Sequence, residues 1–148
     1  MITSIIVGID GSDAAMRALR MGCKIAKQFD AKLQIIHTPL DETVTYAAEA
    51  ISGFYVGANA VRQELLVEAA EKVSEIARAV AAEEGLKGVE VHVGHAEPAR
   101  DVLDLAKASA ADLIVTGRRG LGDLGALVLG STSHQISKHA TCACLTVP

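Results

Sequence analysis

Glycine residues are concentrated in one stretch of the chain, which runs from Gly117 to Ser131 and is followed by two further hydroxyl residues. Glycine allows positive φ angles and lets backbone N–H groups approach a phosphate closely. The hydroxyl residues come where a helix is expected to begin, and the N-terminus of a helix favours an anion. Arg118 and Arg119 add positive charge to the same stretch. These residue types in this order predict a site for a phosphate group.

Two well-known phosphate motifs fit this stretch only in part. Gly120 to Gly125 matches the pattern GxGxxG, but a dinucleotide site also needs an acidic residue about 20 positions further on. The chain has no Asp or Glu after Asp123, so the NAD interpretation fails. Gly125 to Ser131 resembles the phosphate loop GxxxxGK, but Ser131 stands where a lysine is needed to reach the β- and γ-phosphates. Its absence argues against a P-loop NTPase.

A third pattern fits completely. Gly117, Gly120, Gly130 and Ser131 have the spacing G-x2-G-x9-G-S, which resembles the ATP-binding signature of the universal stress protein family. Two flanking segments extend the resemblance over the whole chain. Residues 7–12, V-G-I-D-G-S, resemble the first strand and turn of the family, and residues 111–117, A-D-L-I-V-T-G, resemble its fourth strand.

The resemblance implies that ATP is the ligand, with Mg²⁺ or Mn²⁺ at the triphosphate. Asp10 is then expected to face the triphosphate and its metal ion, while backbone near Gly8 and at Thr38 contacts adenine. Gly117 is expected near the ribose, and the rest of the signature around the phosphates. The expected cofactor-binding residues are Gly8, Ile9, Asp10, Thr38, Thr116, Gly117, Arg118, Arg119, Gly120, Leu121, Gly122, Gly130, Ser131, Thr132 and Ser133.

Two of these residues also have a structural interpretation. Aspartate favours turns and helix caps, so Asp10 could serve only to organise the turn into the next helix. Ser131 could serve only as the cap of the helix that follows it. A cap and a phosphate contact are compatible, so both interpretations of Ser131 stay open.

The sequence departs from the family pattern in two places. The family often has G-x-P before its third helix, whereas the three residues His-Ala-Glu separate Gly94 from Pro98 here, which alters the rim expected beside adenine. The last strand of the family usually reads C-P-V-L-V-V, and residues 142–147 read C-A-C-L-T-V. Because Leu145 and Val147 keep the pattern, the resemblance implies a homodimer through this strand, Cys142 to Val147.

The elements that position these residues alternate between strand and helix. This alternation predicts right-handed crossovers and a parallel sheet. We therefore expect an α/β fold, a single domain over residues 1–148 with an open parallel five-stranded sheet and helices on both faces, and the resemblance implies strand order 3-2-1-4-5. In the long helix, a stripe with Val73, Ile76 and Val80 is predicted to face the core. The predicted strands are 4–9, 32–38, 89–93, 113–116 and 142–147, and the predicted helices are 14–29, 59–84, 98–109 and 131–139.

Composition limits the class of protein. The chain has 148 residues, of which 50% are hydrophobic, and a net charge of −4 without a basic block, so a nucleic-acid partner is not indicated. No apolar run approaches the roughly 20 residues that span a bilayer, and the first residues lack the features of a signal peptide. Three cysteines cannot all pair within one chain, which favours a reduced, cytoplasmic compartment.

Other residues with chemical potential have weaker patterns. Two histidines and two cysteines near the end of the chain suggest zinc, but their spacing matches no strong zinc motif, and small buried thiols are the simpler interpretation. His92 and His95 are expected at the pocket rim or in solvent, and Glu83 with Glu84 is expected to be a solvated helix end. Residues 41–58 carry three of the four aromatics and are interpreted as a loop or short helix. The zinc candidates are His134, His139, Cys142 and Cys144, and the three aromatics are Tyr46, Phe54 and Tyr55.

The resemblance therefore implies an ATP-binding regulator or nucleotide sensor of the stress response, and the missing phosphate-loop lysine predicts slow or no hydrolysis. We expect no catalytic residue, and we expect a regulatory protein as a further partner. Two alternatives stay open. One is an ATP-using enzyme of related α/β architecture, of which residues 10–13, D-G-S-D, are a faint sign. The other is a nucleotide-free dimeric interaction module.

Overall fold

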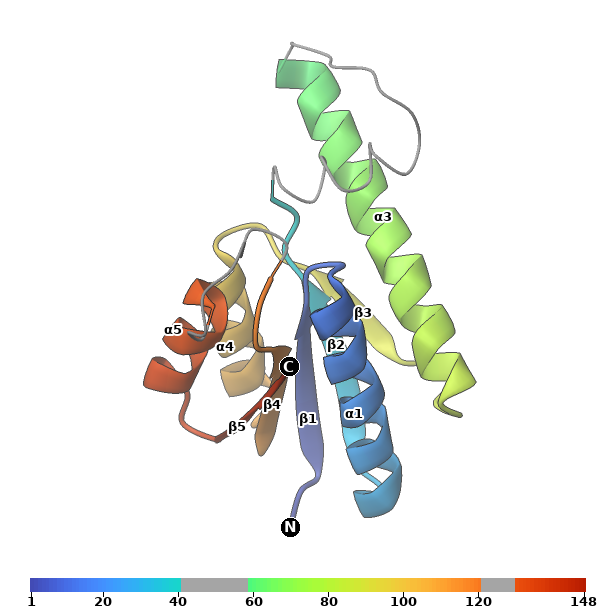
Figure 1. Cartoon of the computed structure of the whole chain (residues 1–148), viewed down its shortest axis with the longest axis vertical. Coiled ribbons are helices and arrows are strands. Elements are labelled where there is room, and N and C mark those ends of the chain that lie inside the picture. The colour runs from blue at the N-terminus through green and yellow to red at the C-terminus, as the bar shows by residue number, and fades with distance from the viewer. Residues whose placement is uncertain (41–58, 121–129) are drawn as a thin grey trace.

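The described part of the chain forms nine elements, and strands alternate with helices from β1 to β5 around a parallel sheet (Figure 1). The computed structural model describes residues 1–40, 59–120 and 130–148. The sheet order is β3-β2-β1-β4-β5, and every neighbouring pair is parallel, as predicted. The bounds are β1 Ser4–Ile9, α1 Asp13–Phe29, β2 Lys32–His37, α3 Asn59–Glu83, β3 Glu90–Val93, α4 Pro98–Ala108, β4 Leu113–Gly117, α5 Ser131–His139 and β5 Ala143–Val147.

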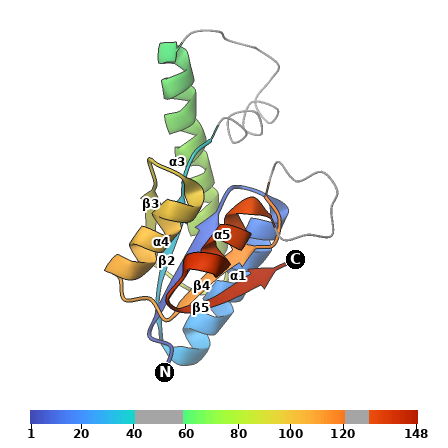
Figure 2. The same cartoon turned by 90° about the vertical axis from the view of Figure 1, so that its left-hand side faces the viewer.

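Two layers of helices cover the sheet. Helices α1 and α3 pack on one face through a core that includes Val7, Leu19 and Ile35. Helices α4 and α5 pack on the other face around Ile114 and Ile136 (Figure 2). Because both faces are buried, the central strands are apolar without alternation, as a parallel sheet requires. The carboxyl ends of all five strands therefore meet at one edge.

Helix α1 begins and ends with local signals in the sequence. The Oγ of Ser12 accepts a hydrogen bond from the N–H of Ala15 at 3.2 Å, which satisfies one of the amides that a helix start leaves unpaired. Gly22 brings the helix close to the sheet, since a Cβ there would lie 2.7 Å from the Cγ2 of Val7. Asp30 ends the helix with a φ of 52°.

Asp112, the residue directly before β4, binds the start of β1 through its side chain. Its Oδ2 accepts hydrogen bonds from the N–H of Thr3 at 2.7 Å, the Oγ1 of Thr3 at 2.9 Å and the N–H of Ser4 at 3.1 Å. These bonds, above all the one from the Thr3 N–H, lower the pKa of Asp112. The aspartate thus fixes the start of β1 beside the start of β4.

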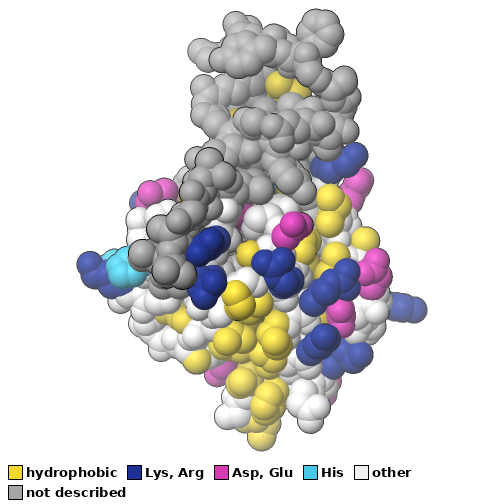
Figure 3. Space-filling view, viewed as in Figure 1, with side chains coloured by type: hydrophobic (Ala, Val, Ile, Leu, Met, Phe, Trp, Pro, Cys, Tyr) yellow, Lys and Arg dark blue, Asp and Glu magenta, His cyan; other side chains and the backbone are white. Residues whose placement is uncertain are grey.

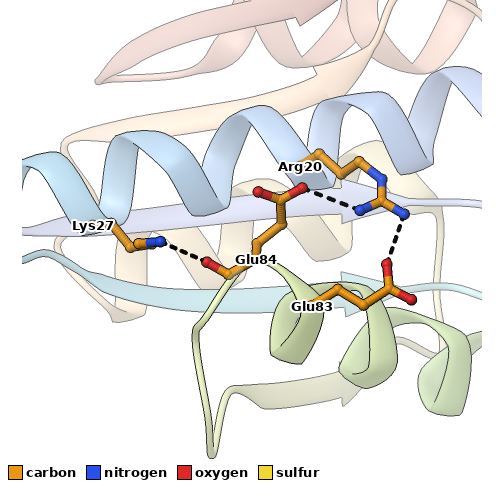
Figure 4. A network of polar contacts seen from close by, with 4 residues as sticks. All are labelled: Arg20, Lys27, Glu83 and Glu84. Atoms are coloured by element: carbon orange, nitrogen blue, oxygen red, sulfur yellow. Dashed lines mark hydrogen bonds and ion pairs between the residues drawn. The ribbon is translucent and has the colours of Figure 1, made fainter.

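Helix α3 differs from its prediction in two respects. Ile76 is 43% exposed, whereas Ala77 is fully buried, because alanine lets the helix lie close to the sheet. Its C-terminal carboxylates are not merely solvated: Arg20 bonds Glu83 at 2.9 Å and Glu84 at 3.1 Å, and Lys27 donates to the carbonyl of Glu84 at 2.9 Å (Figure 4). The prediction of a solvated helix end is therefore wrong for Glu84, whose side chain is only 19% exposed.

Among the described residues, no helix combines the length and the apolar character that crossing a bilayer requires.

Candidate functional site

The predicted site residues gather at the carboxyl edge of the sheet. Gly8 of β1 and Thr116 of β4 are register partners, so the residues that follow them in the two strands lie side by side. Beyond them, Asp10 meets the segment after β4: a Cβ on Gly120 would lie 2.6 Å from the Oδ2 of Asp10. The structure thus brings the first and the last predicted segments together. Leu121 and Gly122 lie outside the described residues.

The start of α5 is held against the end of β4 by the backbone carbonyl of Arg118. This oxygen accepts a hydrogen bond from the N–H of Gly130 at 2.8 Å and another from the Oγ of Ser133 at 3.2 Å. The N–H of Arg118 in turn donates to the carbonyl of Val147 in β5 at 2.6 Å. Both ends of the signature are therefore fixed to each other and to the sheet. We call residues 117–120 and 130–133, with Asp10 opposite, the β4–α5 side.

Gly130, and not Ser131, caps α5. The first helical bond runs from the N–H of His134 to the carbonyl of Gly130 at 2.8 Å, and no side chain of the described residues caps the helix. The alternative of Ser131 as the cap is therefore wrong, because Ser131 is already the first helical residue. The amides of residues 131–133 belong to the first turn, which has no intrahelical acceptor for them.

Two signature glycines are needed for packing. A Cβ on Gly117 would lie 3.0 Å from the backbone C of Ala14 and N of Ala15, so glycine lets β4 end against the start of α1. A Cβ on Gly130 would lie 3.1 Å from the carbonyl oxygen of Arg118. Contacts at 3.0–3.4 Å leave little room for any side chain, so the spacing of these glycines reflects close backbone approach.

Asp10 organises the turn between β1 and α1. Its Oδ1 accepts a hydrogen bond from the N–H of Ser12 at 2.9 Å, which is an Asx turn. The structural role considered from the sequence is therefore confirmed. The Oδ2 of the same carboxylate faces Gly120 across the site. Its role toward a metal ion stays a prediction.

Thr38 lies in a second cluster, which the sequence did not predict. The Oγ1 of Thr38 donates to the Oδ2 of Asp101 at 2.8 Å, and the N–H of Ala96 donates to the same oxygen at 3.1 Å. The N–H of Gly94 donates to the carbonyl of His37 at 2.8 Å. This cluster joins the ends of β2 and β3 to the first turn of α4. We call Thr38, residues 94–97 and Asp101 the β2–α4 side.

His37 lies between the two sides, and sequence reasoning missed it. Its side chain is 1% exposed, and its Nδ1 donates to the carbonyl of Ile9, the residue before Asp10, at 3.0 Å. Its Nε2 is buried and makes no hydrogen bond with the described residues. Burial lowers the pKa of His37, so the imidazole is neutral near neutral pH. The signal that could have identified His37 from the sequence is a histidine at the end of an apolar strand.

The arginines of the signature differ in exposure. Arg118 is exposed, whereas Arg119 is half-buried. The Nε of Arg119 is buried and has no hydrogen-bond partner among residues 1–40, 59–120 and 130–148. A buried guanidinium N–H without a partner is unusual and calls for an acceptor.

The zinc alternative finds no support. In the described ranges, no group of three His, Cys, Asp or Glu side chains could hold a metal ion. Cys144 is exposed and Cys142 half-buried, because β5 is an edge strand, so the interpretation of both as buried thiols is wrong. His92 bonds the Oε1 of Gln34 at 3.0 Å, and His95 is exposed. The predicted aromatics of residues 41–58 lie outside the described residues.

Comparison with known proteins agrees with the fold and identifies the family. The model of the universal stress protein family matches residues 1–148. The universal stress protein YxiE of Bacillus subtilis is 35% identical over 151 residues, which cover 99% of this chain and 99% of the relative. A universal stress protein of Thermus aquaticus is 34% identical over 147 residues, with 99% of each chain covered.

Solved structures have the same fold. UspA from Lactobacillus plantarum matches with a TM-score of 0.79 at 25% identity, over 99% of this chain and 98% of that one. A universal stress protein in complex with cAMP has a TM-score of 0.73 at 23% identity, over 99% and 97% of the two chains. A universal stress protein from Archaeoglobus fulgidus in complex with dAMP has a TM-score of 0.67 at 19% identity, over 100% of this chain and 98% of that one. This chain therefore belongs to the universal stress protein family.

Proposed function

We propose that this protein binds ATP along the carboxyl edge of its sheet and acts as a nucleotide sensor or regulator in a stress response. The observation that carries the proposal is the β4–α5 side: backbone bonds of 2.8 Å and 2.6 Å at Arg118 hold the start of α5 beside β4 and β5, opposite Asp10. Two family members of the same fold bind adenine nucleotides, cAMP and dAMP, which supports the ligand class.

The chemistry of this side fits a triphosphate. The first-turn amides of α5 and the helix dipole favour an anion. Arg119 supplies a buried Nε that has no hydrogen-bond partner among the described residues, and a phosphate oxygen would satisfy it through a charge-assisted bond. Glycine at position 120 lets the segment after β4 come close to the carboxylate of Asp10.

A divalent cation fits the same arrangement. Mg²⁺ is held in nucleotide sites by one or two carboxylates together with phosphate oxygens. Asp10 would supply the carboxylate, and the cation would neutralise the charge between it and the triphosphate. Because Asp10 is already fixed by the Ser12 N–H, little ordering is needed on binding.

The site is better suited to holding ATP than to cleaving it. Ser131 occupies the position of a phosphate-loop lysine, which is the group that assists transfer in P-loop enzymes. His37, the histidine buried beside Ile9, is committed through Nδ1 to a backbone carbonyl. We therefore propose a protein that reports ATP and does not consume it quickly, within a reduced cytoplasm that suits its three free cysteines.

We propose a second copy of this chain as a partner of the β5 edge. β5 is the last strand of the sheet, so one row of its backbone groups has no strand beside it. Leu145, Val147 and Ile2 are partly buried against the core on the α1 face. Figure 3 shows hydrophobic side chains gathered on that face between the two chain ends. Pairing of two β5 strands would cover this surface.

Calorimetry on nucleotide-free protein tests the binding proposal. The protein is unfolded, dialysed free of nucleotide, refolded and titrated with ATP, with and without Mg²⁺, while released phosphate is measured. We expect binding that Mg²⁺ strengthens and little phosphate release. Rapid turnover would favour the enzyme alternative, and the absence of binding at millimolar ATP would favour a nucleotide-free interaction module.

A further inference from the structure

We propose that Asp101 determines the nucleobase specificity of this protein by presenting a hydrogen-bond acceptor to the exocyclic amine of adenine. The inference rests on the proposed function, because it concerns the nucleobase end of the same site. Asp101 lies in the first turn of α4, outside the glycine-rich signature, and no resemblance to a motif assigned it a role.

The first step is the position of Asp101. Its Oδ2 accepts from the Oγ1 of Thr38 at 2.8 Å and from the N–H of Ala96 at 3.1 Å. Thr38 is 6% exposed and directly follows β2, at the carboxyl edge where the ligand is proposed to lie. Asp101 therefore reaches from α4 to the edge of the sheet and fixes the residue expected beside adenine.

The contact between Thr38 and Asp101 requires a glycine at position 94. A Cβ there would overlap both the Oδ2 of Asp101 and the Oγ1 of Thr38. Gly94 is buried, and its N–H bonds the carbonyl of His37 at 2.8 Å. Three segments can converge only because position 94 is glycine. The longer turn from Gly94 to Pro98 gives this chain the Ala96 amide that completes the cluster.

Both hydrogen bonds at Asp101 are donated to its carboxylate. The hydroxyl proton of Thr38 and the amide proton of Ala96 are both given to Oδ2, so they are not available to a ligand. Within the part of the chain that the structure describes, the Oδ1 of Asp101 makes no hydrogen bond, and the residue is half-buried. The side chains of Thr38 and Asp101 thus present acceptors, and no donor, to a ligand.

A pair of side chains that present acceptors and no donor discriminates between purines. Adenine carries a 6-amino group, which donates, whereas hypoxanthine carries a 6-oxo group, which accepts. A carboxylate oxygen opposite the 6-position bonds the first and repels the second. Sites built to bond a polar ligand group reject the analogue that lacks it, because a polar group is then left unpaired.

Asp101 also has a simpler interpretation, which the experiment must separate. An aspartate in the first turn of a helix is favourable at the positive end of the dipole, whatever the ligand. Asp101→Asn separates the two, because the amide keeps one oxygen for Thr38 and Ala96 and turns an NH₂ donor toward the ligand. Asp104→Asn is the matched control, since Asp104 lies on the same helix, exposed, with an ion pair to Arg100 at 3.7 Å.

The test measures the affinity of three probes, ATP, ITP and inorganic tripolyphosphate, for the native protein and both variants. We expect the native protein to prefer ATP over ITP by on the order of tenfold or more. Asp101→Asn should lower that ratio by about tenfold or reverse it, with tripolyphosphate affinity and Tm unchanged. Asp104→Asn should leave the ratio as it is.

The outcomes distinguish this inference from the proposed function. Native protein that binds ATP and ITP equally, or an Asp101→Asn variant that keeps the native ratio, would overturn the role of Asp101 alone. A variant that loses ATP, ITP and tripolyphosphate in the same proportion would show a structural role and would also overturn it. Native protein that binds none of the three probes would overturn the proposed function, and the inference with it.

Discussion

The two sides of the site are built by different means. On the β4–α5 side, backbone atoms make most of the contacts: the carbonyl of Arg118 holds the N–H of Gly130 at 2.8 Å, and glycines permit the approach. On the β2–α4 side, side chains make the contacts, with Thr38 and Asp101 joined across 63 positions of sequence. One side is a short stretch of chain closed on itself, whereas the other is assembled from three segments.

The difference determines how each side responds to change. A backbone site depends on the absence of side chains, so an added Cβ is its main hazard. A side-chain site depends on donor and acceptor types, so it changes its preference when one atom is exchanged. We therefore expect substitutions on the β4–α5 side to remove affinity, and substitutions on the β2–α4 side to alter selectivity.

The largest effect is expected at Gly130. In Gly130→Val, the Cβ would lie 3.1 Å from the carbonyl oxygen of Arg118, and the branched side chain would push the start of α5 away from β4. Overpacking of this kind costs about 1–3 kcal/mol, so we expect ATP affinity to fall by about a hundredfold at the upper end. Calorimetry with ATP and Mg²⁺ measures this loss.

Gly88→Ala is the control for Gly130→Val. Gly88 has a φ of 69° and no atom within 4 Å of an added Cβ, so alanine strains the backbone far from the site. This variant should lose some stability while keeping its ATP affinity. Native affinity in Gly130→Val would place the phosphates elsewhere.

Gly120→Ala is expected to have a smaller effect, confined to the metal ion. The added Cβ would lie 2.6 Å from the Oδ2 of Asp10, and the carboxylate would have to turn away. Titrations with and without Mg²⁺ should show a loss of about tenfold only when the cation is present. Asp10→Asn should behave alike, and the double variant should be no worse than either single variant. Equal losses without Mg²⁺ would argue against Asp10 as the metal ligand.

The sequence was sufficient for the fold and for locating one side of the candidate site. Strand β1 and helix α5 have the predicted bounds, because a buried apolar run marks the first and a cluster of hydroxyl residues marks the start of the second. The β4–α5 side was found because its glycines are close in sequence and their spacing is itself the structural requirement. The family and the sheet order followed from the same residues.

The other side could not be predicted from the sequence. The pairing of Thr38 with Asp101 exists only once β2 and α4 are packed, and no spacing records it. Ile76 and Ala77 show the same limit in the core, since both fit a helical stripe and the distance to the sheet decides which one is buried. His37 was passed over because an isolated histidine in an apolar strand has no partner that the sequence can name.

His37 connects the two sides, and its titration should affect stability more than binding. Its Nδ1 bonds the carbonyl of Ile9 at 3.0 Å, and its own carbonyl accepts from Gly94 at 2.8 Å. Burial holds the pKa of His37 below its usual value of 6.5, so the unfolded chain takes up the proton first. The contribution of His37 to the free energy of unfolding should therefore be fully present above pH 6.5 and should decrease as the pH falls below it.

His37→Asn tests this linkage. The amide nitrogen of asparagine can still donate to Ile9, but it does not titrate. Urea unfolding between about pH 7 and pH 5 should show a decrease in stability for the native protein that is smaller in the variant. Identical pH profiles would mean that His37 has the same pKa in both states.

The smallest effect on the site is expected from the cysteines, which belong to neither side. Cys23 is fully buried, and burial raises its pKa to about 11, so almost no thiolate forms at pH 8. Cys144 is exposed on β5, and the pKa of its thiol is raised less. Alkylation of the native protein should therefore modify Cys144 first and leave Cys23 intact until the chain unfolds. Bound ATP should not alter this order.

Two patterns of protection at Cys144 would carry further information. Protection that increases with protein concentration would support pairing of two β5 edges. Protection that ATP alone produces would mean that the ligand reaches β5 and that the site extends beyond the β4–α5 and β2–α4 sides.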